Sequence, residues 1–314
     1  MNSEQELIDR IARQAGLLGR GLVMGIGDDC AIFRPGRGRE DLLFTTDLLL
    51  ENVHFRRETH GPADVGWKAL ARGLSDIAAM GGEPRFCLVS LGLAEWTDEQ
   101  WVDGFYRGLL RLARRAGVTL AGGDLARSDK LVCDIVVCGT APRGPRANAL
   151  RRKGACPGDS IYVSGRLGGA ALGLALGPSG PRAAWRRHLR PQPRLDLGRF
   201  LRERLRASAA MDLSDGLSLD LRRLCLASKV SASIVAPPRF RGASAEQALH
   251  GGEDYELLFT VPPGRRLPPR FEGVPLTRIG EIRRGRAGVV LLAGTPLEPL
   301  GWDHFRRGDG KPGV

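Results

Sequence analysis

The sequence has few aromatic residues and no pattern typical of a zinc or redox site. Aromatics make up 6% of its 314 residues, and its six cysteines form no CxxC pair and no ligand spacing with histidine. These cysteines predict reduced, buried thiols in a cytoplasmic protein. The first ten residues are polar, and no apolar run approaches the roughly 18 residues that span a bilayer, so we expect neither export nor membrane insertion.

The common nucleotide-binding signatures are also missing. The chain has no GxxxxGK[ST] motif, which excludes a P-loop, and no HRD or DFG motif, which excludes a protein-kinase fold. Any phosphate group bound here must be held by other means, such as metal ions, glycine amides and arginines.

Lysine is scarce, yet the chain is strongly basic. Only five of 47 basic residues are lysine, and the formal net charge is +12. The charge is uneven, with −1 over residues 1–150 and +13 over residues 151–314. An excess of this size makes nucleic acid or an anionic membrane the first partners to consider, the alternative being arginines on solvated helix faces. The arginines are dispersed and the aromatics few, so we expect neither nucleic acid nor membrane as a partner.

Hydrophobic periodicity predicts alternating helices and strands, which is the α/β class, and the length suits two domains of about 150 residues each. A capping box at Ser3 and Glu6 begins the first helix, and Thr97 with Gln100 is predicted to cap another that ends at Gly117. The stretch 141–158, rich in Pro, Gly and Arg, predicts a linker. The expected helices cover 62–80, 97–116, 167–176 and 194–207, and the expected strands 42–51, 86–93, 131–139, 160–164, 255–261 and 289–293.

Seven aspartates stand beside glycine, serine or threonine, where we expect strands to end and turns to begin. One such aspartate is usually a turn former or a helix cap, whereas seven together predict a ligand site. Two of them, three residues apart, are expected to share a face of a helical turn. The seven are Asp28, Asp29, Asp47, Asp76, Asp124, Asp212 and Asp215.

If these carboxylates converge, they require a cation. Two carboxylates about 4 Å apart repel by about 4 kcal/mol at an effective dielectric constant of about 20. Oxygen ligands without histidine or cysteine favour Mg²⁺, which commonly completes its shell with water and substrate phosphates. The glycine pairs 122–123 and 251–252 could let backbone amides approach an oxyanion. The pattern predicts a phosphoryl-transfer site.

An ordered series of motifs from Gly25 to Phe305 resembles the thiamine-monophosphate kinase family, and the resemblance covers nearly the whole chain. The motifs are GIGDDCA (25–31), TTDLLLENVHF (45–55), GWKALARGLSDIAAMGG (66–82), AGGD (121–124), RHLRPQPR (187–194), MDLSDGL (211–217), GGEDYELLFT (251–260) and GWDHF (301–305).

The resemblance implies an enzyme that phosphorylates thiamine monophosphate to thiamine diphosphate with ATP and several Mg²⁺ ions. It implies the two-domain aminoimidazole ribonucleotide synthetase-like fold, an N-terminal sheet that pairs in a homodimer, and a site in the cleft between the domains. We expect an N-terminal domain over 1–147, a C-terminal α/β domain over 148–305 and a flexible tail over 306–314.

The resemblance also implies roles for individual residues, carried over by position. The implied metal ligands are Asp29, Thr45, Thr46, Asp47, Asp76, Asp124, Asp212 and Asp215. The implied ATP contacts are Tyr106, Gly123, Asp124, Arg152 and Ser214, and the implied substrate contacts are His54, Glu253 and Trp302. No general base or covalent residue is assigned, because the attacking phosphate oxygen is already ionised near neutral pH.

Two kinds of alternative remain open. The first is another ATP-dependent enzyme of the same superfamily, similar to aminoimidazole ribonucleotide synthetase, selenophosphate synthetase or the hydrogenase-maturation dehydratase. A selenophosphate synthetase needs a reactive cysteine before the first strand, whereas the first cysteine here is Cys30, inside GDDCA. The second alternative is an arginine-rich nucleic-acid-binding protein.

Overall fold

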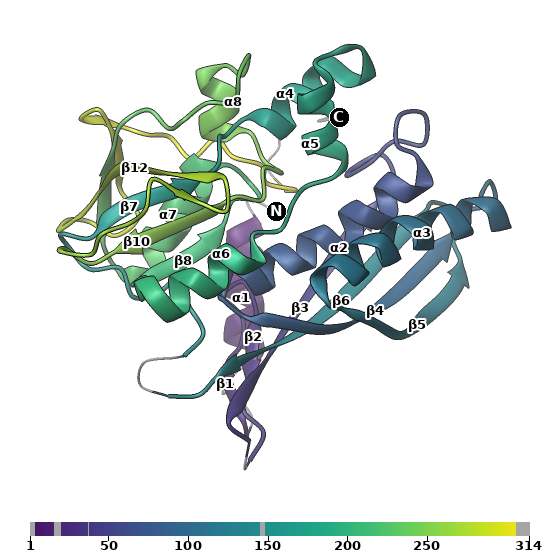
Figure 1. The fold of residues 1–314 in the computed structure, drawn as a ribbon, viewed down its shortest axis with the longest axis horizontal. Coiled ribbons are helices and arrows are strands. Elements are labelled where there is room, and N and C mark those ends of the chain that lie inside the picture. The colour runs from purple at the N-terminus through teal and green to yellow at the C-terminus, as the bar shows by residue number, and fades with distance from the viewer. Residues whose placement is uncertain (1–3, 16–19, 37, 145–147, 306–314) are drawn as a thin grey trace.

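The computed structural model describes residues 4–15, 20–36, 38–144 and 148–305, and these residues form two β-sheets with helices packed against them (Figure 1). The N-terminal sheet has six strands in the order β1-β2-β3-β6-β4-β5, and neighbours are antiparallel except β4 and β5. Its strands are β1 (Leu22–Met24), β2 (Ala31–Phe33), β3 (Glu40–Leu50), β4 (Glu83–Leu93), β5 (Thr119–Arg127) and β6 (Val132–Pro142).

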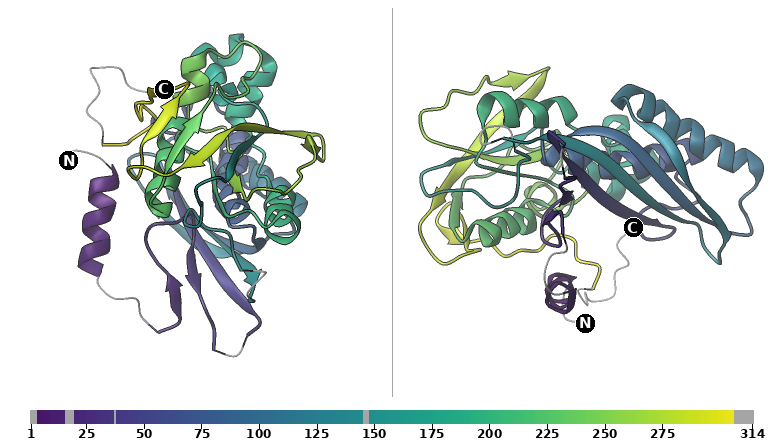
Figure 2. Two further views of the ribbon diagram at one scale, coloured as in Figure 1. Left: turned by 90° about the vertical axis from the view of Figure 1, so that its left-hand side faces the viewer. Right: turned by 90° about the horizontal axis from the view of Figure 1, so that it is seen from below.

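Two long helices, α2 (Pro62–Ala79) and α3 (Glu99–Ala116), cover one face of this sheet (Figures 1 and 2). Thirteen of the 18 residues of α2 are buried, so this helix is a core element on nearly all sides. A Cβ atom on Gly108 of α3 would lie 1.9 Å from the carbonyl oxygen of Ala63, so only glycine lets the two helices approach this closely. The helix α1 (Glu4–Ala15) stands apart from them (Figure 2).

The C-terminal sheet follows the order β14-β13-β9-β12-β7-β10-β8, with β11 paired to β12 and only β13 and β9 parallel. Its strands are β7 (Ser160–Ser164), β8 (Ala209–Asp212), β9 (Ser231–Ile234), β10 (Leu257–Val261), β11 (Arg270–Phe271), β12 (Val274–Arg283), β13 (Val290–Leu292) and β14 (Thr295–Pro296). The helices here are α4 (Gly169–Leu176), the 3-10 turn η1 (Gly177–Ser179), α5 (Arg182–Leu189), α6 (Leu195–Phe200), the π turn η2 (Leu201–Leu205), α7 (Leu217–Ser228) and α8 (Ala245–His250).

The helix α2 joins the two halves of the molecule. It packs against β3 and β6 on one side, and against α6 and β8 on the other. A Cβ atom on Gly198 of α6 would lie 2.0 Å from the carbonyl oxygen of Ala78, so α6 lies directly against the end of α2. Side chains on α2 can therefore reach both halves.

Several predictions of local structure are wrong in detail. Asp98, not Thr97, caps α3 by accepting a hydrogen bond of 2.7 Å from the Trp101 amide, while the Thr97 hydroxyl donates to the carbonyl of Ala94. The predicted helix over 194–207 divides into α6 and η2. The predicted Gly-rich turn AGGD lies within strand β5. The predicted end of α3 at Gly117, in the left-handed conformation, is confirmed.

Other predictions fall on residues that are not described. Ser3 of the predicted capping box, residue 147 at the predicted domain boundary and the tail 306–314 lie outside the described residues, so the division at 147/148 stays a prediction. In the described part of the chain, no helix combines the length and apolar character needed to cross a membrane.

The arginines of the C-terminal half do not all lie on solvated helix faces. Several of them pair with buried or half-buried acids, four of these pairs involving residues of the candidate site or the fully buried Glu256. Glu256, fully buried, receives two of these partners, with Arg194 Nε at 2.7 Å from its Oε2. These four pairs are Arg152 with Asp29, Arg187 and Arg194 with Glu256, and Arg223 with Asp215.

Candidate active site

A cleft of about 970 Å³ opens between the two halves, and elements of both line it. The N-terminal half contributes β3, the loop after it and α2. The C-terminal half contributes α4, α5, the end of β8, the loop 250–255 and the segment 300–304. Charged and aromatic side chains of both halves line the cleft, among them Asp47, His54, Arg72, Asp76, Asp212, Glu253 and Trp302.

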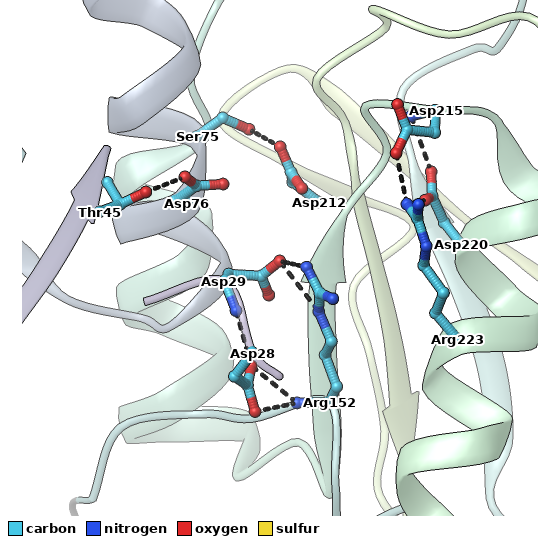
Figure 3. Close-up of polar contacts among 10 residues, drawn as sticks. All are labelled: Asp28, Asp29, Thr45, Ser75, Asp76, Arg152, Asp212, Asp215, Asp220 and Arg223. Carbon is cyan, nitrogen blue, oxygen red and sulfur yellow. Dashed lines mark hydrogen bonds and ion pairs between the residues drawn. The ribbon is translucent and has the colours of Figure 1, made fainter. Parts of the chain in front are cut away.

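Three aspartates form the centre of this site, and we call them the carboxylate cluster. Asp29 follows β1, Asp76 lies on α2 and Asp212 ends β8 (Figure 3). One carboxylate oxygen from each lies within 4.8 Å of the others. The prediction that these aspartates converge is therefore confirmed for three of the seven, although Asp76 stands within a helix and not at the end of a strand.

Short-range partners orient the cluster without neutralising it. The hydroxyl of Thr45 donates to Asp76 and that of Ser75 donates to Asp212 at 2.7 Å. Asp29 Oδ2 is buried and has no hydrogen-bond partner among the described residues. Burial, and then the charges of neighbouring aspartates, hold the pKa of the Asp76 carboxyl well above its usual range, and burial and Asp29 do the same for Asp212. Such crowding is what a bound divalent cation relieves.

Arg152 is the cation that bonds the cluster directly among the residues that the structure describes. Its Nε lies 3.1 Å from Asp29 Oδ1, and its backbone amide donates to Asp28 at 3.2 Å (Figure 3). Burial and the Asp29 charge raise the pKa of Asp28 to about 7. Arg152 thus joins the start of the C-terminal half to the loop that carries Asp29.

The predicted metal ligands on strand β3 lie on opposite faces of the strand. Thr45 and Asp47 face α2, and Asp47 accepts a hydrogen bond of 2.9 Å from Arg72 Nη2. Thr46 faces the other way and donates to Asp134 at 2.7 Å. Because side chains alternate along a strand, the Thr46 hydroxyl lies on the opposite face from the carboxylate cluster.

The prediction that Asp212 and Asp215 share a helical face is wrong. Asp212 ends β8, whereas Asp215 lies in the loop before α7 and pairs with Arg223 (Figure 3). The buried carboxylate of Asp220 accepts the amide of Asp215 at 3.1 Å and so fixes this loop. Ser214 and Asp215 line the cleft but do not belong to the carboxylate cluster, and their roles in metal and ATP binding stay predictions.

The other end of the cleft holds the Glu253 ion-pair group, made of Lys68, Glu253 and His188, in which Lys68 is the charged partner of Glu253 while burial and then Lys68 lower the pKa of His188. Lys68 Nζ is fully buried, lies 2.7 Å from Glu253 Oε1 and donates to the carbonyl of His54 at 3.0 Å. His188 Nδ1 lies 3.1 Å from Glu253 Oε2. Burial opposes ionisation of Glu253, but Lys68 and His188 outweigh it and hold the pKa of Glu253 well below its usual range.

Glu253 also occupies an unusual backbone conformation. Its φ is 66°, in the left-handed region that few residues other than glycine adopt, and Tyr255 has φ 48°. The amide of Glu253 donates to the Ser214 carbonyl at 2.7 Å, so this strained loop is tied to the loop after β8. The structure therefore fixes Glu253 between the two halves of the molecule.

His54 and Trp302, predicted to contact substrate, both line the cleft near this end. Burial, and then the charge of Arg72, lower the pKa of His54 to about 3, so the ring is neutral at physiological pH. Its Nδ1 accepts the Leu50 amide at 3.0 Å, which leaves the proton on Nε2. Trp302 is 38% exposed and its ring meets His304 edge to face.

Besides Thr46, the predicted site residues Tyr106, Gly123 and Asp124 are not brought to the cluster within this chain. Tyr106 lies on α3 and packs against Phe105. A Cβ on Gly123 would lie 1.8 Å from the carbonyl oxygen of Val89, so this glycine permits β4 and β5 to pair. Asp124 is exposed and accepts only a hydrogen bond from the Leu125 amide at 2.9 Å among the contacts of described residues.

The register of the sheet explains the position of Asp124. Asp124 pairs with Ser90, Ser90 with Asp134, and Asp134 with Leu48. Cross-strand partners share a face, so Asp124 lies on the face of Leu48, opposite that of Asp47. We call this the outer face of the N-terminal sheet.

Sequence reasoning missed Lys68 and Arg72, both on α2 and both at the cleft or its wall. Each stands in an apolar helical stretch, GWKALARGL, where a charged residue breaks the hydrophobic pattern. A cation at a position that periodicity assigns to the buried face was the available signal, since buried charges are rare unless paired.

The fold and this acidic cleft define a class of protein. Residues 27–141 match the family model described as AIR synthase related protein, N-terminal domain. The hydrogenase maturation protein HypE in complex with ATP shares the fold, with a TM-score of 0.66 over 82% of this chain and 84% of that one, at 21% identity. The predicted aminoimidazole ribonucleotide synthetase-like fold is confirmed.

Proteins with higher sequence identity to this chain identify the family within this class. The thiamine-monophosphate kinase of Bacillus subtilis is 36% identical over 310 residues, covering 90% of this chain and 94% of the relative. The solved structure of AaThiL complexed with AMPPCP and TMP has a TM-score of 0.85 and 35% identity, covering 96% of this chain and 97% of that one. This chain belongs to the thiamine-monophosphate kinase family, as its motifs predict, and is an enzyme of the kinase class.

Proposed function

We propose that this protein transfers the γ-phosphoryl group of ATP to the phosphate of thiamine monophosphate and so forms thiamine diphosphate and ADP. The observation that carries the proposal is the carboxylate cluster of Asp29, Asp76 and Asp212, of which Asp76 and Asp212 line a cleft between the two sheets. Support comes from the family, whose relatives carry this activity in their name, and from the related structure complexed with AMPPCP, an ATP analogue, and TMP.

The transfer is a direct in-line displacement. An oxygen of the acceptor phosphate forms a new bond to the γ-phosphorus, and the bond from that phosphorus to the β–γ bridging oxygen breaks as ADP leaves. The acceptor oxygen is already ionised, so the chain needs no general base. Positioning and charge neutralisation then supply the rate enhancement.

The residues present fit magnesium. The cluster offers only oxygen donors, Asp29 Oδ2 is buried without a partner among the described residues, and the crowded carboxyls have raised pKa values. We propose that Asp29, Asp76 and Asp212, with Asp47, Thr45 and Asp215 nearby, hold several Mg²⁺ ions. Bound there, these ions neutralise the phosphate oxygens of the reacting groups.

The Glu253 end of the cleft is proposed to bind the thiamine moiety. The neutral His54 ring carries its proton on Nε2 and can donate to an anionic oxygen. Trp302, partly exposed at the rim, presents an aromatic surface for a cationic thiazolium ring. The ion-paired Glu253 holds the loop that closes this end.

Arg152 and Ser214 are proposed to contact ATP together with Tyr106, Gly123 and Asp124. The first two lie at the cluster or in the cleft, which supports their assignment. Thr46 and Asp124 lie on the outer face of the sheet, so their proposed metal contacts require that face to belong to a site.

We further propose a homodimer that pairs through the outer face of the N-terminal sheet. Leu48 and Leu88 are 47% and 37% exposed on that face, where exposed leucines favour burial against a second copy. Leu48→Asp is expected to shift the protein from dimer to monomer in sedimentation velocity. A monomeric wild-type protein contradicts the proposal.

Domains spanning 1–147 and 148–305 and a cytoplasmic location complete the proposal. Each sheet is built from residues on one side of the proposed boundary. All six cysteines are free and five of them are buried, which suits a reducing compartment.

The test is to incubate the purified protein with ATP, MgCl₂ and thiamine monophosphate and to separate the products by chromatography. Equal amounts of thiamine diphosphate and ADP are expected. Transfer only to a different acceptor supports another enzyme of the superfamily, and ADP with inorganic phosphate but no thiamine diphosphate contradicts the proposed acceptor.

A further inference from the structure

One basic residue of the cleft has unused hydrogen-bonding groups. Arg72 lines the cleft, its side chain is 13% exposed, and its Nη2 donates to Asp47 at 2.9 Å. Its Nε and Nη1 are buried and have no hydrogen-bond partner among the described residues. A buried N–H group without a partner is costly, and a guanidinium left in this state is suited to an anionic ligand.

The position of Arg72 on α2 identifies which anion. Lys68, Arg72 and Asp76 are four residues apart, so they lie on one face of the helix at intervals of about 6 Å along its axis. Asp76 belongs to the carboxylate cluster, and Lys68 bonds Glu253 and the His54 carbonyl. Arg72 therefore lies between the proposed metal site and the proposed thiamine site.

In the proposed reaction, the phosphate group of thiamine monophosphate is the group that lies between the thiamine site and the metal site. We infer that Arg72 binds the phosphate group of thiamine monophosphate through its guanidinium, an inference that rests on the proposed function. The planar guanidinium can donate two parallel N–H groups to phosphate oxygens, whereas an ammonium group cannot. A positive group here also offsets the repulsion between two phosphate groups that must approach one another.

A chemical cycle tests this contact directly. Binding of thiamine monophosphate and of thiamine, which lacks the phosphate, is measured by calorimetry on wild type and Arg72→Gln, in saturating MgCl₂ and AMPPCP. Arg72→Gln is expected to weaken binding of thiamine monophosphate 10-fold or more and binding of thiamine less than 2-fold. Equal losses for both ligands overturn the inference.

Kinetics provide a second readout. Arg72→Gln should raise KM for thiamine monophosphate 10- to 100-fold and leave KM for ATP within about 3-fold, and Arg72→Lys should recover only part of the loss. If Arg72 acts only through Asp47, the Mg²⁺ concentration for half-maximal activity rises while KM for thiamine monophosphate stays unchanged, and the inference fails. The matched control is Arg107→Gln, an exposed arginine on α3.

The two proposals can fail separately. If wild type binds thiamine monophosphate in a phosphate-dependent and Arg72-dependent way but forms no thiamine diphosphate, the proposed function fails and the Arg72 contact stands. If wild type forms thiamine diphosphate and Arg72→Gln behaves as wild type does, only the Arg72 contact fails. A folded Arg72→Gln protein is verified by its circular dichroism and melting temperature.

Discussion

The two ends of the cleft bury charge in opposite ways. At one end Asp29, Asp76 and Asp212 bring three carboxylates within 4.8 Å of one another, with Arg152 bonded to Asp29. At the other end Glu253 is matched by Lys68 and His188 at 2.7 and 3.1 Å. The pKa values of the Asp76 and Asp212 carboxyls are raised, whereas the pKa of Glu253 is lowered.

The difference shows which end of the cleft has its charges balanced by other residues of the chain. The Glu253 ion-pair group carries its own counter-charge, so it can hold the two halves in register before any ligand arrives. The carboxylate cluster lacks sufficient counter-charge within the described residues, and the cations that we propose to bind there would supply it.

The largest expected effect breaks the carboxylate cluster. Asp76→Asn should lower kcat by about 10³-fold or more, because one oxygen ligand loses its charge where the phosphates are neutralised. The fold should be retained, since burial holds the pKa of Asp76 far above normal and the neutral amide resembles the protonated acid. Steady-state kinetics in MgCl₂ measure the loss of kcat. The melting temperature in EDTA measures whether the fold is retained. Near-full activity in Asp76→Asn and in Asp47→Asn contradicts the metal-cluster account.

The next effect breaks the paired end. Lys68→Met leaves Glu253, whose side chain is 23% exposed, without its fully buried lysine partner, which should cost up to about 3 kcal/mol in the free energy of unfolding. Denaturant unfolding measures the loss, and the double variant Lys68→Met with Glu253→Gln should recover most of it, because no unpaired charge then remains. If the single variant costs less than about 1 kcal/mol, the ion pair does not stabilise the protein.

The pH dependence of the free energy of unfolding distinguishes the carboxylate cluster from the Glu253 ion-pair group without a mutation. The pKa values of Asp28 and Asp220 are raised from 3.8 to about 7. A carboxyl whose folded pKa is raised keeps its proton in the folded state, so stability is lost as pH rises through that pKa. In EDTA the free energy of unfolding should therefore fall from pH 6.5 to pH 8, by on the order of 1 kcal/mol per such group.

The chosen window lies above the range in which His54, His60 and Glu253 titrate. The carboxyls of Asp76 and Asp212, whose pKa values are also raised, contribute in the same direction as Asp28 and Asp220. The pKa values of His54 and His60 are lowered from 6.5 to about 3, so their contributions change only below pH 6.5. Glu253, whose pKa is lowered in the folded protein, affects the pH dependence of stability only below the ordinary glutamate pKa of 4.5. Saturating MgCl₂ should flatten the slope, and the same slope with and without MgCl₂ argues against a metal at the cluster.

The smallest effect concerns the rim of the paired end. Trp302→Ala should raise KM for thiamine monophosphate about 2- to 5-fold, the value of an exposed cation–π contact, and leave KM for ATP unchanged. Its 38% exposure predicts little change in melting temperature. A larger rise in KM for ATP than for thiamine monophosphate places Trp302 on the nucleotide side instead.

The sequence predicts the family and the closeness of three aspartates better than it predicts the remaining geometry of the candidate site. The chain belongs to the family that its motifs indicate, and Asp29, Asp76 and Asp212 lie close together as expected. The signal for this closeness was the number of aspartates beside small residues, because so many carboxylates at such positions indicate a shared ligand site. The strand register that turns Asp124 to the outer face depends on pairing between β4, β5 and β6, which local patterns do not encode.

Tertiary contacts also account for the local errors. Thr97 and Asp98 are adjacent, and either residue type can cap a helix. In the structure the Thr97 hydroxyl donates to the carbonyl of Ala94, so Asp98 is the residue that caps α3. Lys68 breaks the pattern of an apolar helix, but its partner Glu253 is 185 positions along the chain. Such pairs become visible only when the two halves pack on α2.

The metal dependence of the reaction tests the central claim most directly. Formation of thiamine diphosphate from ATP and thiamine monophosphate should be measured on the wild-type protein across a titration of MgCl₂ from EDTA-treated buffer. We predict no product without Mg²⁺ and a steep rise as the ion is added, while Asp76→Asn stays inactive throughout. Thiamine diphosphate formed at the same rate in EDTA would contradict the claim that the carboxylate cluster works through bound cations.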